Sequence, residues 1–274
     1  MPNYDSFSVH SFGDEAHKHF CPKEYSALKF GSNTAARNFG HDLASRFFEA
    51  HTDILLANRC VVIPSPYNHV ENAATIMTKH FVDRLNELLV MANGEHVEYS
   101  IIHRKVSYTN DYGFLSKEKR KGLISSDQFY MNKQFLKGKM LIFVDDIRIT
   151  GTHEEKLKEV LETERLQNDA FFLYFARYYG NSPAIEAELN FAAVKSPDDY
   201  LALINQDNHH LIVRPIKYLL GLPPDDLASI INRIPEAFVM KVFHGCLGEG
   251  YYRIPGYQGN FQLIKSILER RSKS

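Results

Sequence analysis

The stretch "KMLIFVDDIRITGTHEEKL", Lys139 to Leu157, carries the strongest structural signal in this chain. Met140 to Val144 is apolar at every position, which is typical of a strand buried on both faces of a parallel sheet. Two adjacent carboxylates, Asp145 and Asp146, follow directly. Because ligands of open α/β sheets bind at the carboxyl ends of the strands, the pattern predicts that the acid pair faces a ligand.

A short turn suited to an anion follows the two acids. Gly151 permits a tight turn, and Thr150 and Thr152 supply hydroxyl groups on either side of it. The sequence predicts a helix from about Thr152, and the first amides of a helix attract negative charge. Two carboxylates that bind a diol beside a phosphate cradle indicate a sugar phosphate.

Other interpretations of the acid pair need weighing. Asp-Asp after a strand also fits a plain helix-capping loop, and the pattern alone leaves that alternative open. A Walker B element is disfavoured because no G-x-x-x-x-G-K-[ST] sequence occurs in the chain. A receiver-type acid pocket needs acids near the start of the chain and a late lysine, and the order of residues here does not suit it.

Strand and helix patterns alternate through the first two thirds of the chain. The first thirty residues show no clear period, and Ser32 is a candidate N-cap for a helix that begins at Asn33. The segments that follow are a strand at 60–63 halted by two prolines, a helix at 70–92, a strand at 97–106, a long polar loop at 107–133, and strands at 140–144 and 170–177. This order predicts an α/β fold with a mostly parallel sheet flanked by helices.

The strand signal fades after Asn181, where several short segments open with Pro, Asp or Ser in the manner of helices. We therefore expect an α/β domain over residues 1–180 and a helical C-terminal extension over residues 181–274. The stretch from His244 to Gly259 is rich in glycine and tyrosine, and we expect an ordered loop there.

Composition limits the classes of function. The chain has 274 residues, of which 44% are hydrophobic and 24% charged, with a formal net charge of -1. That balance gives no bulk basic field for nucleic acid, and no apolar run reaches the length of a membrane span. The three cysteines are far apart and the first residues do not resemble a signal peptide, so we expect a cytoplasmic protein.

The motif as a whole resembles a known family. "MLIFVDDIRITGT" resembles the phosphoribosyl pyrophosphate (PRPP) motif of type I phosphoribosyltransferases. The preceding segment, "GFLSKEKRKGLISSDQFYMNKQFLKGKMLIFVDD", is similar to that of the ComF-like branch, including the group found in tellurite-resistance and stress gene clusters. The resemblance covers roughly residues 29–178 and implies the type I phosphoribosyltransferase fold.

The resemblance implies roles for particular residues. The acids Asp145 and Asp146 would bind the ribose hydroxyls and, mainly through substrate and water, Mg2+. The 5′-phosphate loop would be Thr150, Gly151 and Thr152. The pyrophosphate loop would lie within "PSPYN" and include Ser65, Pro66 and Tyr67. The basic residues of a mobile lid would be Arg104, Lys105, Arg120 and Lys121.

The chain departs from the family pattern near the motif. Arg148 and Ile149 replace the usual spacer and first threonine, and His153 stands where a second threonine is common. Arg148 either contacts phosphate or points to solvent, and His153 is either a ligand-binding residue or an ordinary residue of the helix start. The "PSPYN" stretch also lacks the glycines that are common in pyrophosphate loops.

The implied activity is transfer of ribose 5-phosphate from PRPP to a small nitrogenous acceptor with release of pyrophosphate, with Mg2+ as cofactor. The same fold also serves non-catalytic regulatory proteins that bind PRPP or a nucleotide, and this alternative remains open. Family members often form a hood over the acceptor from N-terminal residues, which makes Tyr25 and Phe30 stacking candidates. The alternative for both is core packing, which is the commoner fate of such aromatic residues. Members are commonly dimers, so the resemblance leaves a homodimer open as well.

Overall fold

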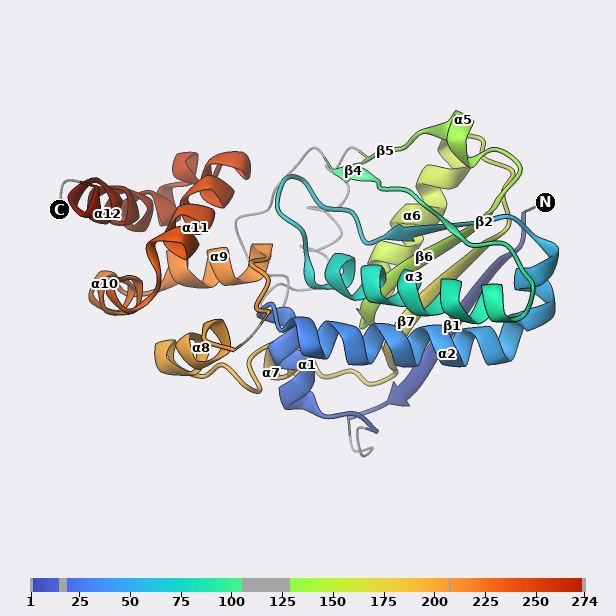
Figure 1. Cartoon of the computed structure of the whole chain (residues 1–274), viewed down its shortest axis with the longest axis horizontal. Coiled ribbons are helices and arrows are strands. Elements are labelled where there is room, and N and C mark those ends of the chain that lie inside the picture. Colours follow the sequence, from blue (N-terminus) through green and yellow to red (C-terminus); the bar gives the residue numbers. More distant parts are fainter. Residues whose placement is uncertain (1, 15–18, 105–128, 207, 273–274) are drawn as a thin grey trace.

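The computed structural model describes residues 2–14, 19–104, 129–206 and 208–272. Its centre is a sheet of five strands in the order β1-β7-β6-β2-β3, and every neighbouring pair is parallel. The strands are β1 (Tyr4–Phe12), β2 (Cys60–Pro64), β3 (Glu98–Tyr99), β6 (Met140–Arg148) and β7 (Ala170–Tyr178). The predicted α/β class with a mostly parallel sheet flanked by helices is confirmed (Figure 1).

Alternate residues of the central strands enter two separate hydrophobic cores. On one face, Val62, Ile142 and Leu173 pack with the helices α2 (Asn33–Ala57) and α3 (Ala73–Met91). On the other, residues such as Phe143 and Phe172 pack with α6 (Thr152–Thr163). The central strands are buried on both faces, which explains why they read as continuous apolar runs.

The helix α2 begins as the sequence predicts, because the side chain of Ser32 accepts a hydrogen bond of 3.3 Å from the amide of Ala35. The predicted helix 70–92 is also present as α3, where Asn72 is the N-cap. These two long helices lie side by side across the sheet (Figure 1).

The chain after the sheet is helical, as expected. A third hydrophobic core joins the last helices and takes in Phe30 from the N-terminal part. The helices of this part of the chain are α7 (Ile185–Asn190), α8 (Pro197–Ile204), α9 (Val213–Gly221), α10 (Pro224–Arg233), α11 (Glu236–Gly248), the 3-10 turn η2 (Tyr251–Arg253) and α12 (Pro255–Arg271). In Figure 1, α8 to α12 lie beyond one end of the sheet rather than over its faces.

The N-terminal segment has more structure than its sequence indicates. Strand β1 forms an edge of the sheet, and α1 (Pro22–Lys29) follows it. Most of β1 is only partly buried, so its sequence lacks both a continuous apolar run and a strict alternation. Its pairing with β7 is a tertiary contact that local periodicity does not encode.

The predicted strand 97–106 is wrong as a single element. Its first part, β3, joins β2, whereas β4 (His103–Arg104) pairs antiparallel with β5 (Phe129–Tyr130), which lies within the predicted loop 107–133. The last ladder bond runs from the amide of Ser100 to the carbonyl of Val62. The next amide on that side of β2 belongs to Pro64, and proline has no N–H to continue the ladder. A short helix, α5 (Lys133–Leu136), leads into β6.

The predicted loop from His244 to Gly259 is also wrong, because most of it is helical. Helix α11 continues to Gly248, and η2 and α12 follow with short connections. The glycines of α11 are contact positions: a Cβ on Gly245 would lie 2.5 Å from the side chain of Ile216. Glycine lowers intrinsic helix propensity, but here it allows close packing that the local sequence does not reveal.

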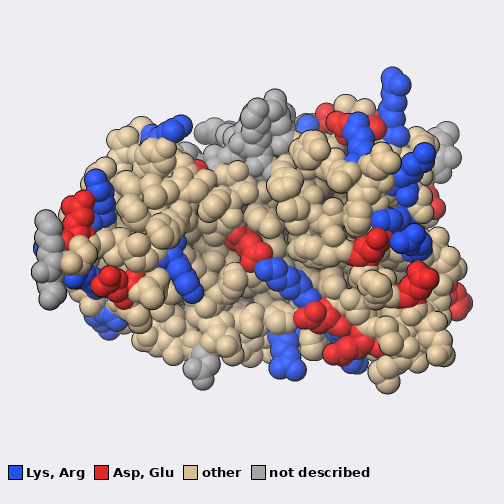
Figure 2. Space-filling model, turned by 45° about the horizontal axis from the view of Figure 1, so that its top comes forward, with Lys and Arg blue, Asp and Glu red and all other residues tan. Residues whose placement is uncertain are grey.

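Charged side chains of both signs are distributed over the face shown in Figure 2, over the sheet part and the helical part alike. This matches the nearly balanced formal charge of the chain. Among the described residues, no helix is both long and apolar enough to span a membrane.

Phe47 lies in the hydrophobic core between the sheet and the helices α2 and α3, and its substitution tests that core. Its side chain is fully buried and contacts the rings of Phe7 and Phe171. We expect Phe47→Ala to lower the free energy of unfolding by about 3–5 kcal/mol, because the cavity cannot fully collapse. The matched control is Phe48→Ala, since Phe48 is only partly buried and should cost clearly less. Urea denaturation measures both, and equal losses would contradict this description of the core.

Candidate functional site

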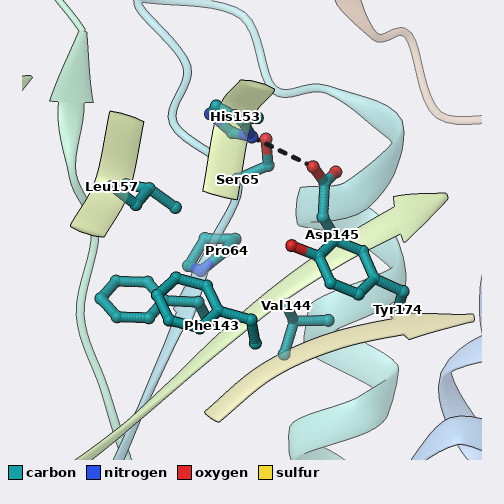
Figure 3. A pocket seen from close by; sticks show the side chains of 9 residues that line it. Pro64, Ser65, Phe143, Val144, Asp145, His153, Leu157 and Tyr174 are labelled. Atoms are coloured by element: carbon teal, nitrogen blue, oxygen red, sulfur yellow. Dashed lines mark hydrogen bonds and ion pairs between the residues drawn. The ribbon is translucent and has the colours of Figure 1, made fainter. Parts of the chain in front are cut away.

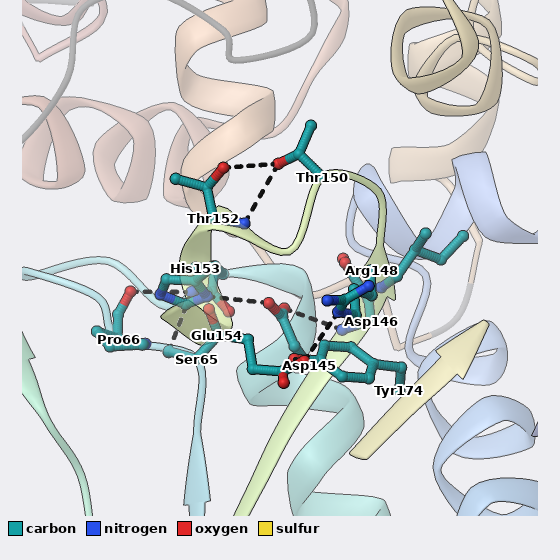
Figure 4. Close-up of polar contacts among 12 residues, drawn as sticks. Ser65, Pro66, Asp145, Asp146, Arg148, Thr150, Thr152, His153, Glu154 and Tyr174 are labelled. Atoms are coloured by element: carbon teal, nitrogen blue, oxygen red, sulfur yellow. Dashed lines mark hydrogen bonds and ion pairs between the residues drawn. The ribbon is translucent and has the colours of Figure 1, made fainter. Parts of the chain in front are cut away.

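The acid pair lies within the last residues of β6, because the strand continues to Arg148. Asp145 stands beside Tyr174 of β7 in the parallel register. The amide of Asp146 donates to Oδ1 of Asp145 at 2.9 Å, and the amide of Ile147 donates to Oδ1 of Asp146 at 2.7 Å. Both carboxylates therefore keep one oxygen on the backbone and turn the other toward a side-chain partner. Figure 4 shows this for Asp145, which faces His153.

Each acid has a cationic or ionisable partner from elsewhere in the chain. Nζ of Lys29, at the end of α1, forms an ion pair with Oδ2 of Asp146, and these side chains are only 17% and 8% exposed. Nδ1 of His153 lies 3.1 Å from Oδ2 of Asp145 and donates a hydrogen bond to it. Sequence analysis missed Lys29, because a single lysine 117 positions before the motif carries no local signal.

The electrostatic balance favours the ionised form of Asp145. Burial raises the pKa of this carboxyl, but the hydrogen bond and charge of His153 and the charge of Lys29 lower it by more. The net effect is that the pKa of Asp145 lies below its ordinary value. The carboxylate is thus kept as an acceptor of hydrogen bonds, which suits contact with hydroxyl groups.

The turn after the acids has the geometry expected of a small-anion loop. Gly151 has a φ of +76°, in the left-handed region where a side chain would strain the backbone. The hydroxyls of Thr150 and Thr152 lie 3.0 Å apart, and the amide of Thr152 donates to Oγ1 of Thr150 at 3.4 Å. Helix α6 begins here, so its first amides face the same loop.

A hydrogen-bond network around the buried carboxylate of Glu154 supports this loop. Glu154 is 6% exposed; its Oε2 accepts from Nε of Arg148 at 2.8 Å and from the hydroxyl of Tyr174 at 3.0 Å, and its Oε1 accepts from Lys158 at 2.6 Å. The guanidinium lies against the loop, since a Cβ on Gly151 would be 2.5 Å from a terminal nitrogen of Arg148. The side chain of Arg148 is therefore held against the turn and does not extend into solvent.

Sequence analysis also missed Glu154 and Tyr174. The available signal was a hydroxyl-bearing residue inside the apolar strand at 170–177 and an acid in the first turn of α6. Burial raises the pKa of Tyr174 well above its ordinary value, and the charge of Glu154 raises it further. Tyr174 consequently stays protonated and serves as a hydrogen-bond donor.

A small pocket opens beside Asp145 at the carboxyl end of the sheet (Figure 3). Ser65 of the loop after β2 lies next to His153, and Asp145 lies across from these two residues. The remaining lining residues are largely apolar: Pro64, Phe143, Val144, Leu157, Phe172 and Tyr174. The structure thus brings together the acid pair, the start of α6 and part of the "PSPYN" stretch.

The loop after β2 is held in a defined conformation. Nδ2 of Asn72 donates to the carbonyls of Ser65 and Pro66 at 3.2 and 3.3 Å. Tyr67 forms a bridge with His103, next to Arg104 in β4. The backbone that carries Arg104 therefore lies close to this loop.

Three predicted lid residues, Lys105, Arg120 and Lys121, lie outside the residues that the structure describes. The two stacking candidates are wrong as exposed platforms, since Tyr25 is 3% and Phe30 0% exposed. Tyr25 packs in the sheet core and Phe30 in the core of the C-terminal helices. The alternative of ordinary core packing holds for both aromatic rings.

The donor set suits a hard cation bound mainly by a ligand and water. Carboxylate oxygens such as those of Asp145 and Asp146 are donors that Mg2+ prefers. Within the described ranges, no group of three or more His, Cys, Asp or Glu side chains could hold a metal ion by itself. A magnesium ion here would need oxygen atoms of a bound phosphate compound to complete its coordination.

The buried pair of Lys29 and Asp146 can be tested by stability. We expect Lys29→Met to lower the free energy of unfolding by about 3–5 kcal/mol, because it leaves a buried carboxylate without its cation. The double variant Lys29→Met/Asp146→Asn should regain much of that loss. Lys23→Met, on a more exposed side chain of the same helix, is the matched control. Additive losses in the double variant, measured by urea denaturation, would contradict the pairing.

The lowered pKa of Asp145 predicts a pH dependence of stability. In the window below an unfolded-state pKa of about 3.9, the folded protein binds fewer protons at this carboxyl than the unfolded chain. The stability that Asp145 provides is therefore present above that pH and is lost as pH falls through the folded-state pKa. Unfolding of wild type and Asp145→Asn should differ most at neutral pH and converge below about pH 4. A constant difference across that range would show that ionisation of Asp145 is not the cause.

Comparison with solved structures finds hypoxanthine phosphoribosyltransferases. The enzyme from Staphylococcus aureus is 8% identical in sequence and matches 53% of this chain and 76% of its own, with a TM-score of 0.34. A point mutant of the Trypanosoma cruzi enzyme, complexed with the product IMP, is 11% identical and matches 56% and 77%, also with a TM-score of 0.34. A comparison with curated protein sequences gives no match.

The family comparison covers far more of the chain. The family model described as "PRTase ComF-like" matches residues 4–264, which includes both the sheet and most of the C-terminal helices. The acid pair of β6, the Gly151 turn and the start of α6 lie inside that match, as the motif resemblance predicts. This chain belongs to the ComF-like phosphoribosyltransferase family.

Proposed function

We propose that this protein binds PRPP and transfers ribose 5-phosphate to a small nitrogenous acceptor, with release of pyrophosphate. The observation that carries the proposal is the acid pair of β6 placed beside the Gly151 turn and the start of α6. Membership in a phosphoribosyltransferase family supports the same class of reaction. The ligand site would lie in residues 1–180, with residues 181–274 as a supporting region.

The residue roles follow from chemistry and position. The carboxylates of Asp145 and Asp146 would accept hydrogen bonds from the two ribose hydroxyls. The amides and hydroxyls of Thr150, Gly151 and Thr152 would bind the 5′-phosphate. His153 would orient Asp145, and Arg148 would support the phosphate loop through its contact with Gly151.

The pyrophosphate end of the substrate would lie toward the loop of Ser65, Pro66 and Tyr67. Ser65 lines the same pocket as Asp145, which supports that placement. Arg104, Lys105, Arg120 and Lys121 would provide positive charge for the leaving group. Asp145 and Asp146 would help to hold Mg2+, mainly through substrate and water, and the ion would supply positive charge for the pyrophosphate.

The exchange of bonds at ribose C1 requires little covalent chemistry from the protein. The bond to the pyrophosphate oxygen breaks with its electron pair, and a nitrogen of the acceptor forms the new bond at the same carbon. Positive charge develops on the sugar between these events, and the carboxylates of Asp145 and Asp146 would stabilise that charge. Catalysis would therefore depend on positioning and electrostatics.

A second candidate is a regulatory protein that binds PRPP or a nucleotide without catalysis. The observation that favours it is the ion pair between Lys29 and Asp146, because an acid already compensated by the protein depends less on a metal-bound substrate. The lack of glycine in the "PSPYN" loop points the same way. Binding without turnover would support this candidate.

A pyrophosphate-release assay separates the two functions. We expect the wild type to release pyrophosphate from PRPP only with Mg2+ and with one class of nitrogenous base from a panel. Asp145→Asn should lower the rate about 10- to 100-fold, since it removes a charge-assisted contact to the ribose. Removal of Mg2+ with a chelator should abolish release.

The control for this assay is Asp169→Asn. Asp169 directly precedes β7, at the end of the sheet opposite the acid pair, and its carboxylate accepts a hydrogen bond from the amide of Asn3. The variant should leave both binding and release unchanged. Tight PRPP binding by the wild type without release for any base would favour the regulatory candidate. Failure to bind PRPP or a nucleotide at all would overturn both.

A further inference from the structure

A carboxylate from the C-terminal helices reaches the loop after β2. Glu249, the residue that follows α11, is 7% exposed. Its Oε1 accepts hydrogen bonds from two consecutive backbone amides, those of His69 at 2.9 Å and Val70 at 2.7 Å. Its Oε2 accepts from Nδ2 of Asn68 at 3.4 Å. Three neighbouring donors of the loop therefore converge on one buried carboxylate.

The surface that surrounds this contact is shaped for the loop. A Cβ on Gly248 would lie 1.9 Å from the ring of His69, so only glycine permits that approach. A Cβ on Gly245 would lie 3.3 Å from Cγ2 of Val70, whose side chain packs against the core of the C-terminal helices. The glycines of α11 thus belong to the same contact as the carboxylate.

The loop continues from this contact to the pocket without a break. Asn72 holds the carbonyls of Ser65 and Pro66, and Ser65 lines the pocket with Asp145. Val213, at the start of α9, donates its amide to the carbonyl of Glu71 at 2.9 Å, which adds a second tie between the loop and the C-terminal helices. The conformation of residues 65–72 therefore depends on both parts of the chain.

We propose that Glu249 is a positioning residue of the ligand site and that its carboxylate takes the anion position of the amides of His69 and Val70. Consecutive backbone amides that converge on one point form an anion site, and here the protein supplies the anion itself. A phosphorylated ligand then contacts the Ser65–Tyr67 side of the loop. The C-terminal helices act as a brace that fixes this loop against the sheet. This inference rests on the proposed function for the nature of the ligand.

Two measurements test the brace, and the full chain is used in both. The first is hydrogen exchange of peptides that cover residues 66–72, with peptides of β6 as an internal reference. We expect Glu249→Ala to speed exchange at the amides of His69 and Val70 roughly 10- to 100-fold, since a charge-assisted acceptor is lost. The β6 peptides should keep their protection. Glu249→Gln, which retains an oxygen acceptor, should restore most of the protection.

The second measurement is the affinity for PRPP in the presence of Mg2+. Glu249→Ala should weaken binding roughly tenfold or more, with Glu249→Gln in between. The matched control is Asn260→Ala: Asn260 of α12 donates to the carbonyls of Leu220 and Leu222 and does not contact the loop in these bonds. It should loosen the C-terminal helices without a change in loop exchange or in PRPP affinity.

The outcomes separate this inference from the proposed function. If Glu249→Ala and Asn260→Ala raise exchange equally in the loop and in β6, Glu249 is only a stability residue and the inference is overturned. If loop exchange rises while PRPP affinity stays at the wild-type value, the link to the ligand site is wrong. If the wild type does not bind PRPP, the proposed function fails, and the exchange result alone then decides whether Glu249 positions the loop.

Discussion

The acid pair at the end of β6, with Asp146 buried and Asp145 partly buried, is the constraint on which the rest of the site depends. Two adjacent carboxylates at the carboxyl end of an apolar strand are stable only when other groups compensate their charge. Lys29 of α1 pairs with Asp146, and His153 of α6 bonds Asp145. Segments that are far apart in sequence are thereby drawn to one end of the sheet.

The same requirement organises the turn that follows. A left-handed glycine lets the chain reverse into α6, and its missing Cβ leaves room for the guanidinium of Arg148 beneath the loop. Glu154 accepts a hydrogen bond from that guanidinium, and Lys158 and Tyr174 donate to the same carboxylate. The ion pair of Arg148 and Glu154 thus supports the loop, and the hydroxyls of Thr150 and Thr152 bond each other within it. A preorganised loop loses little conformational entropy when it binds a ligand.

The C-terminal helices extend this organisation to the loop after β2. They have their own hydrophobic core, against which Val70 packs, and they also form specific hydrogen bonds with residues 68–71. A family match that continues to residue 264 fits a chain in which both parts form one functional unit. The glycines of α11 show the same dependence, since they allow close contact with the loop.

The sequence by itself determined the parallel α/β class, the position of the acid pair and the turn with its helix, because each follows from local periodicity or from the special conformation of glycine. It also indicated the helical character of the last third of the chain. Only the tertiary structure decided the partners of those acids, the edge position of β1 and the pairing of β3 and β4 in two different sheets. Lys29, Glu154 and Glu249 acquire their roles from contacts that the fold creates, two of them over 117 and about 180 positions. No local pattern encodes such contacts, because they arise only once the apolar segments have packed.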